Sequence, residues 1–461
     1  MNTFRIGVTV VALQVLLVNW LHSEGNSLDV ELAGKKVEAP EVMEPDVDLG
    51  RPKNPEFNEL LVLFEHPEVL KVEREVERWK REKKISLAPW FPNFSASFQW
   101  EDSTKYDHPT LGEQDQSRSV SRLSVDQLLF DFGEGYFQYQ TAVEEWKGIQ
   151  AKLYETCDRI IYEGLSAGLK SLLQKKLLDQ AIASEKNFLE QKGLEQQKVK
   201  GGQGFSTDVL QVEVQHLGAL AKVQQASLDH ASALEGVVRW WGKDGMSFSE
   251  EFLVRIESLM EETPLPEPSE LADWVDGAPA LLQNRHERLA MSSRKYSMMG
   301  GRWGPKVSLR LVSQRGEELG GVGSYDREDR VSLQAELPLN LGGTFIDEVA
   351  SVGLQLESLV EEGRGLARET LKDLKVGILT LKTKSELVKT RRDQMRIAQK
   401  YLEGAEKERL MGRRSLIDVL NGELLRLQAE SEMEIARVER VLAWSRVLQL
   451  CGRLGQTFSL Q

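Results

Sequence analysis

Four stretches of the chain alternate between apolar and polar residues. The pattern is strictest at residues 93–100, where Phe94, Phe98 and Trp100 occupy even positions and polar residues occupy the odd ones. A period of two predicts strands with one apolar and one polar face. The predicted strands cover residues 93–102, 119–130, 305–313 and 329–340. The polar segments between paired strands, within 101–119 and 314–330, are predicted to be exposed loops.

Long stretches without proline follow each pair of predicted strands. Residues 134–200 and 344–411 contain no proline, and Leu374, Ile378 and Leu381 show the spacing of a coiled coil. At ~1.5 Å per residue, each stretch predicts a helix on the order of 100 Å long.

Shorter helical segments flank the strands and the long helices. They are predicted at residues 57–88, 281–300, 206–241 and 416–451. In the first half of the chain, the short helices before and after the long one would together equal its length if they were stacked end to end. This match in length favours a wall of paired helices in which every apolar face is buried.

The same plan occurs twice, which indicates a tandem duplication. Three pairs of landmarks share an offset of 210 residues: Gly133 and Gly343, Asp208 and Asp418, and Gly242 and Gly452. The predicted organisation is a first repeat at 56–242 with its hairpin turn at 201–206, a linker at 243–280, a second repeat at 281–455 with its turn at 411–415, and a tail at 456–461. An acidic, proline-containing arm is predicted at 25–55.

The first residues are typical of a secretory signal peptide, predicted at 1–24. Arg5 precedes an apolar run from residue 6 to residue 20, which is short for a membrane span. No later segment is long and apolar enough to span a membrane as a helix, so a mature chain in a membrane is expected to use a barrel. Four strands are too few to close a pore, so such a barrel needs several chains.

Composition excludes several functions. The net charge of −13 argues against a nucleic-acid partner. The two cysteines, Cys157 and Cys451, belong to no CxxC or Cys/His cluster, so neither a metal site nor a cofactor is predicted. No Ser/His/Asp constellation or convincing carboxylate pair stands out, and the chain is predicted not to be an enzyme.

Two short motifs have structural interpretations. Asp131-Phe132-Gly133 resembles a kinase tripeptide, but the other kinase motifs are absent. Both copies keep a glycine between strand and helix, at Gly133 and Gly343, which predicts a turn that needs permissive backbone angles. The glycine-containing breaks around Gly204 and Gly412 are predicted to be helix-to-helix turns.

Several stretches, in this order along the chain, resemble the TolC-type outer membrane efflux protein family, the outer membrane factors. They are residues 54–57 or 66–69, 92–97, 129–133, 204–210 and 415–421. The resemblance covers about 54–455, nearly the whole mature chain.

The resemblance implies an α+β, mostly α fold and a homotrimer. Antiparallel helical hairpins would form a long α-helical barrel in the periplasm. Four strands per chain would form a trimeric twelve-stranded β-barrel in outer membrane lipid. The implied function is the exit duct of a tripartite efflux pump or of a type I secretion system, with a periplasmic adaptor protein and an inner-membrane transporter as partners. The alternative is a periplasmic coiled-coil tether without channel activity.

The family also implies a gate at the hairpin turns. By motif position, Thr207 and Asp208 would face Arg409 and Arg414, and a charge-assisted pair there would hold the gate shut. Asp418 and Asn421 lie one helical turn apart and would ring the lumen of a trimer. The sequence departs from the family at two of these positions, since Asn421 replaces a common acid and Arg409 replaces a common aromatic residue. Solvated charges at helix ends are the alternative interpretation of all six.

Overall fold

The computed structural model describes residues 60–459 except 107–112, 203–204, 243–247, 268, 320–324 and 338–343. The chain divides into two units, residues 1–48 and 49–461, and all the described residues belong to the second. The predicted signal peptide and the whole of the predicted arm lie outside the described residues, as do Gly204 and Gly343.

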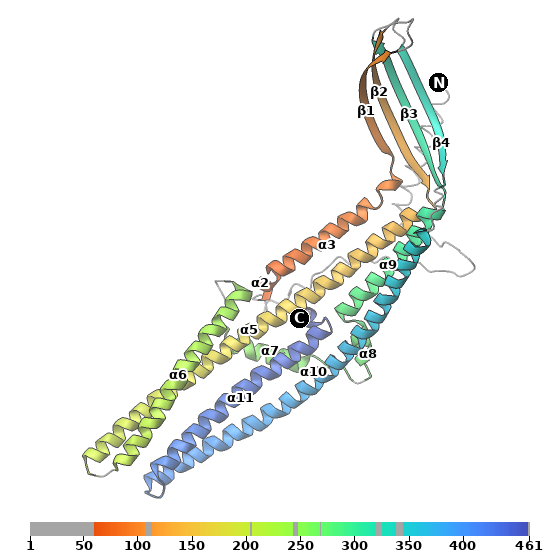
Figure 1. The fold of residues 1–461 in the computed structure, drawn as a ribbon. Coiled ribbons are helices and arrows are strands. Elements are labelled where there is room, and N and C mark those ends of the chain that lie inside the picture. Colours follow the sequence, from red (N-terminus) through yellow and green to blue (C-terminus); the bar gives the residue numbers. More distant parts are fainter. Residues whose placement is uncertain are drawn as a thin grey trace. The chain divides into compact units, whose positions relative to one another are not determined.

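The four predicted strands form one antiparallel sheet in the order β1-β2-β3-β4 (Figure 1). Their bounds are β1 Asn93–Tyr106, β2 Glu113–Phe130, β3 Lys306–Leu319 and β4 Tyr325–Glu336. The central pair, β2 and β3, joins hairpins from the two halves of the chain.

The strands are longer than the sequence pattern predicts. Much of 101–119 and 314–330 was expected to be loop, but the pairing continues from Asn93↔Asp126 as far as Tyr106↔Glu113. The loop prediction is therefore wrong for most of these segments. The backbone ladder satisfies its own hydrogen bonds whatever the side chains are, so a polar sequence does not end a strand.

Helices account for most of the chain. Their bounds are α2 Leu61–Phe64, α3 Pro67–Ile85, η2 Ala88–Trp90, α5 Glu134–Lys200, α6 Ser206–Trp241, α7 Glu250–Glu262, α8 Leu271–Asp276, α9 Pro279–Trp303, α10 Thr344–Leu410, α11 Leu416–Leu450 and α12 Leu454–Ser459. The two long helices were predicted almost to the residue. The predicted helix 57–88 is interrupted, because His66 caps a new helix whose first residue is Pro67.

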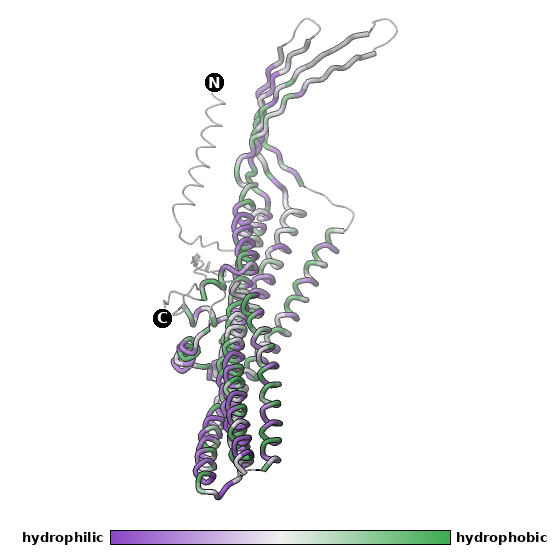
Figure 2. The backbone as a smooth tube through the Cα atoms, turned by 90° about the vertical axis from the view of Figure 1, so that its left-hand side faces the viewer, coloured by the Kyte–Doolittle hydropathy of each residue, from purple (hydrophilic) through white to green (hydrophobic). Residues whose placement is uncertain are grey.

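Each long helix forms a hairpin with the shorter helix that follows it, α5 with α6 and α10 with α11 (Figure 1). The helices pack in two sequences, α3–α5–α9–α10 and α6–α5–α11–α10. Figure 2 shows hydrophobic and hydrophilic residues interspersed along these helices, as expected where each helix buries only a stripe. Leu153, Ile160, Leu169 and Trp444 are among the fully buried members of the core. None of the described helices combines the length and apolar character of a membrane-spanning helix.

The segment 243–280, expected to be partly a loop, contributes a packed helix. Phe252 and Ile256 of α7 are fully buried in the main core. Two arginines of α11 fix the polar side of α7: Arg437 Nη2 lies 2.8 Å from Glu257 Oε2, and Arg440 Nη2 lies 3.0 Å from Glu257 Oε1. The many prolines nearby suggested a linker, whereas the amphipathic stretch between them is long enough to pack.

The Asp-Phe-Gly tripeptide caps the start of α5. Asp131 Oδ1 accepts from the backbone N–H of Gly133 at 3.1 Å, and Asp131 Oδ2 accepts from that of Gly135 at 2.7 Å. Gly133 has a φ of 84°, which favours glycine. Gly133 thus lies at the turn between β2 and α5, with the Asp131 carboxylate as an N-terminal cap.

The C-terminal residues are also part of the core. Phe458 of α12 is 1% exposed and packs edge-on against Trp444. Asp158 of α5 is buried, and its carboxylate accepts from the backbone N–H groups of Leu454 at 3.2 Å and Gly455 at 2.8 Å. Burial raises the pKa of Asp158 to about 7, against the opposing effect of the two backbone donors. The predicted tail thus includes a docked helix.

The titration of Asp158 predicts a pH-dependent stability. Between about pH 4 and about pH 7 the folded carboxyl keeps its proton while the unfolded one loses it, so stability falls as pH rises through this range. The contribution is complete below about pH 4 and lost above about pH 7. Asp158→Asn cannot titrate, and we expect it to flatten this part of the profile. Thermal unfolding midpoints of the two proteins in detergent across this range test the prediction, and parallel profiles would contradict it.

Candidate functional site at the helix hairpin turns

The two hairpin turns share a glycine with a positive φ just after the long helix. Gly202 ends the α5 side of the first turn with a φ of 74°, and Gly412 ends the α10 side of the second with a φ of 73°. Each glycine donates its N–H to a carbonyl of the preceding helix, Val199 and Arg409 respectively, at 3.1 and 2.9 Å. These left-handed positions explain why a glycine occurs at each turn.

The start of α11 uses Asp418 as a cap. Ser415 and Asp418 form a capping box, with the Asp418 N–H donating to Ser415 Oγ at 3.3 Å and the Ser415 N–H donating to Asp418 Oδ2 at 3.3 Å. Asn421 lies one turn further along and is exposed. The Asp418 carboxylate therefore has a structural role within the single chain.

Arg414 is held by its own hairpin. Its Nε donates to Glu408 Oε2 at 2.7 Å and its Nη1 donates to Tyr401 Oη at 3.0 Å. The guanidinium also lies over the Tyr401 ring, 5.4 Å from the centroid. These contacts fix Arg414 near the end of α10.

Arg409 links the two hairpins. Its Nη2 donates to Glu195 Oε1 at 2.7 Å, and Lys198 Nζ donates to the same oxygen at 2.7 Å. The Glu195 side chain is only 6% exposed, so two cations compensate a nearly buried carboxylate. This contact connects the end of α5 with the end of α10.

The predicted pairing of Thr207 and Asp208 with the two arginines is not among the contacts of the single chain. Within the described residues, neither side chain has a hydrogen bond or an ion pair, and both arginines have other partners. Glu195, which sequence reasoning missed, is the acid that meets Arg409. Nothing in the sequence distinguishes it from the rest of the 72 acidic residues, apart from Lys198 one turn later. The roles of the six predicted residues in a closed gate stay a prediction.

Above the turns, polar contacts connect α5 with α11. Lys176 Nζ lies 2.7 Å from Glu434 Oε2, and Ser431 Oγ lies 3.0 Å from Gln180 Oε1. Apolar contacts also cross between the hairpins, since Leu420 of α11 belongs to the same buried cluster as Phe188 and Val212 of the first hairpin. The hairpins are thus joined by apolar packing together with polar pairs, which can exchange with water.

No metal centre is found among the described residues, since they contain no cluster of three potential ligands. Cys157 and Cys451 form no disulfide. Burial raises the pKa of the Cys451 thiol to about 12, so it stays protonated at neutral pH.

Comparisons with known proteins give relatives along most of the chain. It is 24% identical over 419 residues to the alkaline protease secretion protein AprF of Pseudomonas aeruginosa, covering 86% of this chain and 84% of AprF. The outer-membrane channel OprN superposes with a TM-score of 0.71 at 14% identity, covering 88% of this chain and 92% of OprN. The CmeC outer membrane channel of Campylobacter jejuni gives a TM-score of 0.69 at 13% identity, covering 89% and 84%. No family model matches the sequence.

The four-stranded antiparallel sheet and the two long helical hairpins define an outer membrane channel fold. The resemblance to the TolC-type outer membrane efflux protein family is confirmed by this fold together with the AprF relative. The predicted localisation in the outer membrane agrees with OprN and CmeC, which are outer membrane channels. A chain that is not an enzyme is consistent with relatives named as channels and a secretion protein.

Proposed function

We propose that three copies of this chain form an outer membrane channel, the exit duct of a tripartite efflux pump or a type I secretion system. One observation carries the proposal: the single chain leaves exposed the apolar surfaces that a closed, membrane-embedded tube would cover. They lie on the sheet, on α6 and on α10.

On α6, the exposed stripe has the spacing of a coiled coil. Val212 and Ala219 are buried on the side that faces α5. On the opposite side, apolar residues recur in steps of three, four and seven, and all are exposed: Leu210, Val214, Leu217, Ala221 and Leu228. Such a stripe predicts a second helix as a partner.

On α10, an equivalent stripe lies opposite the buried one. Leu374, Leu381 and Val388 are buried seven residues apart. On the opposite side of α10, exposed apolar or threonine side chains recur every seven residues. They are Val376, Thr383, Thr390 and Ile397, and the first three follow the buried residues by two positions. Because α6 and α10 are the end members of one packing sequence, α6 of one copy can meet α10 of the next and close a ring.

The sheet exposes an apolar face as well. Phe94, Phe98 and Trp100 of β1 are 69%, 72% and 61% exposed, and Leu333 of β4 is 68% exposed. The opposite face is polar, with hydrogen bonds such as that between Arg122 and Gln314. This arrangement fits lipid on one side and an aqueous lumen on the other.

The apolar residues run diagonally across the sheet. The distal limit of the apolar run is Trp100 on β1, Leu123 on β2, Leu311 on β3 and Val331 on β4. Following the strand register, this limit moves by four residues from β1 to β2, by two from β2 to β3 and by none from β3 to β4, an average of two per strand. A strand rises ~3.3 Å per residue and neighbouring strands lie ~4.8 Å apart. If the apolar layer is flat, the average shift means that the strands are tilted by roughly 50° from the normal of this layer. Membrane barrels have strands with a similar tilt, about 35–45°.

Closure also accounts for the sheet edges. β1 and β4 are the outer strands of the sheet, with 14 and 12 residues. Long unpaired edges favour association, and closing the sheet removes them. Three copies, each pairing β4 with β1 of the next, would make the twelve-stranded barrel that the family implies.

The tandem duplication is part of the same proposal. It is supported by helices of matching length, 67 residues for both α5 and α10 and 36 and 35 residues for α6 and α11. Left-handed glycines also recur 210 residues apart, Gly202 with Gly412 and Gly242 with Gly452.

The proposed partners follow from the site and the relatives. AprF is a secretion protein, and OprN and CmeC are outer membrane channels, so we propose an adaptor and an inner-membrane transporter as partners, with the hairpin turns as the docking and gating end. The polar contacts between hairpins support gating by movement of whole hairpins. The alternative, a periplasmic tether, leaves the exposed apolar face of the sheet without a use.

Two neighbouring residues on opposite faces of β4 give a matched test. Leu333→Arg places a cation in the apolar face, at a cost of about 2–4 kcal/mol in a bilayer. Gln334→Arg places the same cation on the polar face. We expect the first variant to lose most of its insertion into liposomes and its conductance, and the second to keep both. Equal insertion of the two variants would contradict a lipid-facing sheet.

A further inference from the structure

The outer edges of the helical packing carry opposite charges in a pattern that reverses along the helices. On α10, residues 344–363 contain five acidic residues and no basic residue. Residues 375–410 contain ten basic and five acidic residues. The same helix is therefore acidic near the sheet and basic towards its hairpin turn.

The other edge has the reverse order. α3 contains seven basic and five acidic residues, and α6 contains four acidic and two basic residues. α3 leads directly through η2 into the sheet, and α6 begins at the hairpin turn. This edge is therefore basic near the sheet and has a small acidic excess towards the turn, where Glu213 is already paired with Lys192 of α5.

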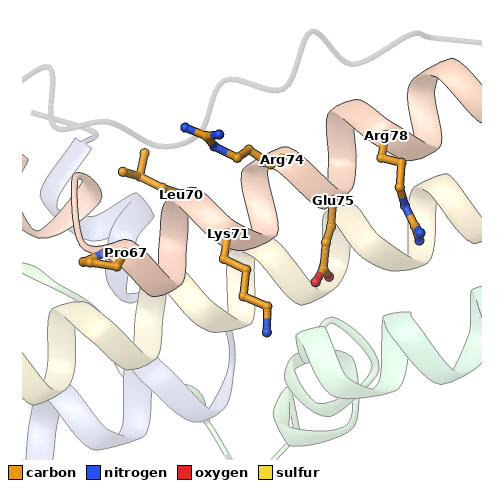
Figure 3. Close-up of a pocket in the computed structure, with 6 residues that line it drawn as sticks. All are labelled: Pro67, Leu70, Lys71, Arg74, Glu75 and Arg78. Carbon is orange, nitrogen blue, oxygen red and sulfur yellow. The ribbon is translucent and has the colours of Figure 1, made fainter.

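The basic residues of α3 lie away from its packed side. Val72 is buried towards α5, while Lys71, Arg74 and Arg78 are exposed. They line an open groove of about 620 Å³ along the helix, with Leu70 and Glu75 also on its wall (Figure 3). Among the described residues, none of the three cations forms an ion pair, although Arg78 lies 5.1 Å from the Trp79 ring centroid.

The acidic residues of α10 lie on its outward side in the same way. Phe345 and Val352 are buried, whereas Asp347, Glu357 and Glu361 are exposed. Glu361 has only an exposed local partner, Arg364. α3 has 19 residues and ends near the sheet, and the acidic part of α10 has nearly the same length and begins there. In antiparallel alignment, the two charged segments would lie at the same height.

The lower parts match by the same reasoning. α6 and the basic part of α10 both extend 36 residues from the hairpin turns. On α10, exposed basic residues recur every seven positions directly beside the proposed seam: Lys375, Lys382, Lys389 and Arg396. Their heptad spacing places them along one flank of the apolar stripe, where coiled coils carry the charges that choose partners.

We infer that the seam between two copies of this chain contains a charge reversal, with α3 on acidic α10 near the sheet and α6 on basic α10 near the turns. The inference rests on the trimer proposed above and adds the charged contacts that fix the axial alignment of neighbouring copies. A neighbour that slides along the seam, or that enters upside down, puts like charges together. The apolar stripes supply adhesion, and the charges select one axial register.

Charge exchange tests the seam. The triple variant Lys71→Glu/Arg74→Glu/Arg78→Glu should raise the protein concentration needed for assembly in detergent at low salt by roughly tenfold or more. The triple variant Asp347→Lys/Glu357→Lys/Glu361→Lys should do the same. Combining all six substitutions restores opposite charges, so the combined variant should assemble close to the wild-type level. This rescue distinguishes a lost contact from a misfolded chain.

Two further measurements make the result decisive. Lys80→Glu/Lys84→Glu, on another side of α3, should leave assembly unchanged. Added salt should weaken wild-type assembly and lessen the defect of each triple variant, because exposed charges are screened. A wild-type protein that is monomeric overturns the proposed trimer itself. A wild-type trimer whose triple variants assemble normally, or are not rescued by their combination, overturns the charged seam alone.

Discussion

Leu217→Asp together with Leu228→Asp is expected to give a folded chain that stays monomeric. Both leucines lie on the exposed stripe of α6, at 57% and 63% exposure, so neither substitution disturbs the packing within one chain. In an assembled ring the same positions would be buried against α10 of the next copy. Burying a carboxylate in the centre of the apolar stripe costs several kcal/mol in desolvation, even with the lysines of α10 on the flank of the seam, and a closed ring of three repeats that cost at every seam.

Light scattering in detergent measures the assembly state, and far-UV circular dichroism checks that the helices are retained. Leu220→Asp is the matched control, because Leu220 is on the same helix and 38% exposed but lies outside the stripe. We expect the control to form trimers with full conductance. If the double variant still forms stable trimers, the stripe on α6 is not part of the interface.

The long elements were predictable because one local signal runs through each of them. α5 spans 134–200 as predicted, since an unbroken apolar period without proline is enough to define a helix. The strand ends were not predictable in the same way. The pairing Tyr106↔Glu113 depends on a neighbouring strand rather than on the local alternation of apolar residues.

The missed features depend on contacts between distant segments. Asp158 caps a helix that begins nearly three hundred residues later, and no spacing in the sequence connects the two. Glu195 meets Arg409 for the same reason, across 214 residues. The sequence predicted that charges would link the hairpin turns but could not identify which acid would lie nearest the arginine.

The balance of interactions around the turns suggests how they could move. Phe188 and Val212 of the first hairpin are fully buried, in a cluster that also contains Leu420 of α11. Between the hairpins, Arg409 and Glu195 form one charged contact close to both turns. A change that breaks this contact leaves each hairpin intact, so a two-state opening of the turns is physically accessible.

Glu195→Ala is therefore expected to loosen the turns and raise the conductance of the closed channel. The substitution removes the acceptor of Arg409 and Lys198, and hydrogen bonds to charged groups contribute about 1.5–3 kcal/mol. Glu195→Gln keeps an acceptor without the charge and should have an intermediate effect. Arg409→Ala should resemble Glu195→Ala, and the double variant should be little worse than either one, because both remove the same contact.

Asp208→Ala is the informative control for this series. Family position predicts that Asp208 forms the lock, but its side chain has no partner among the described residues, whereas Glu195 holds two cations. We expect planar-bilayer recordings of the unassisted channel to give near wild-type conductance for Asp208→Ala and raised conductance for Glu195→Ala. The reverse ranking would mean that the trimer re-pairs the arginines with Asp208 of a neighbouring hairpin. It would also mean that the contact within one chain does not hold the gate. Because Asp208 lies in the first turn of α6 and Glu195 near the end of α5, the two outcomes assign the lock to different helices of the same hairpin.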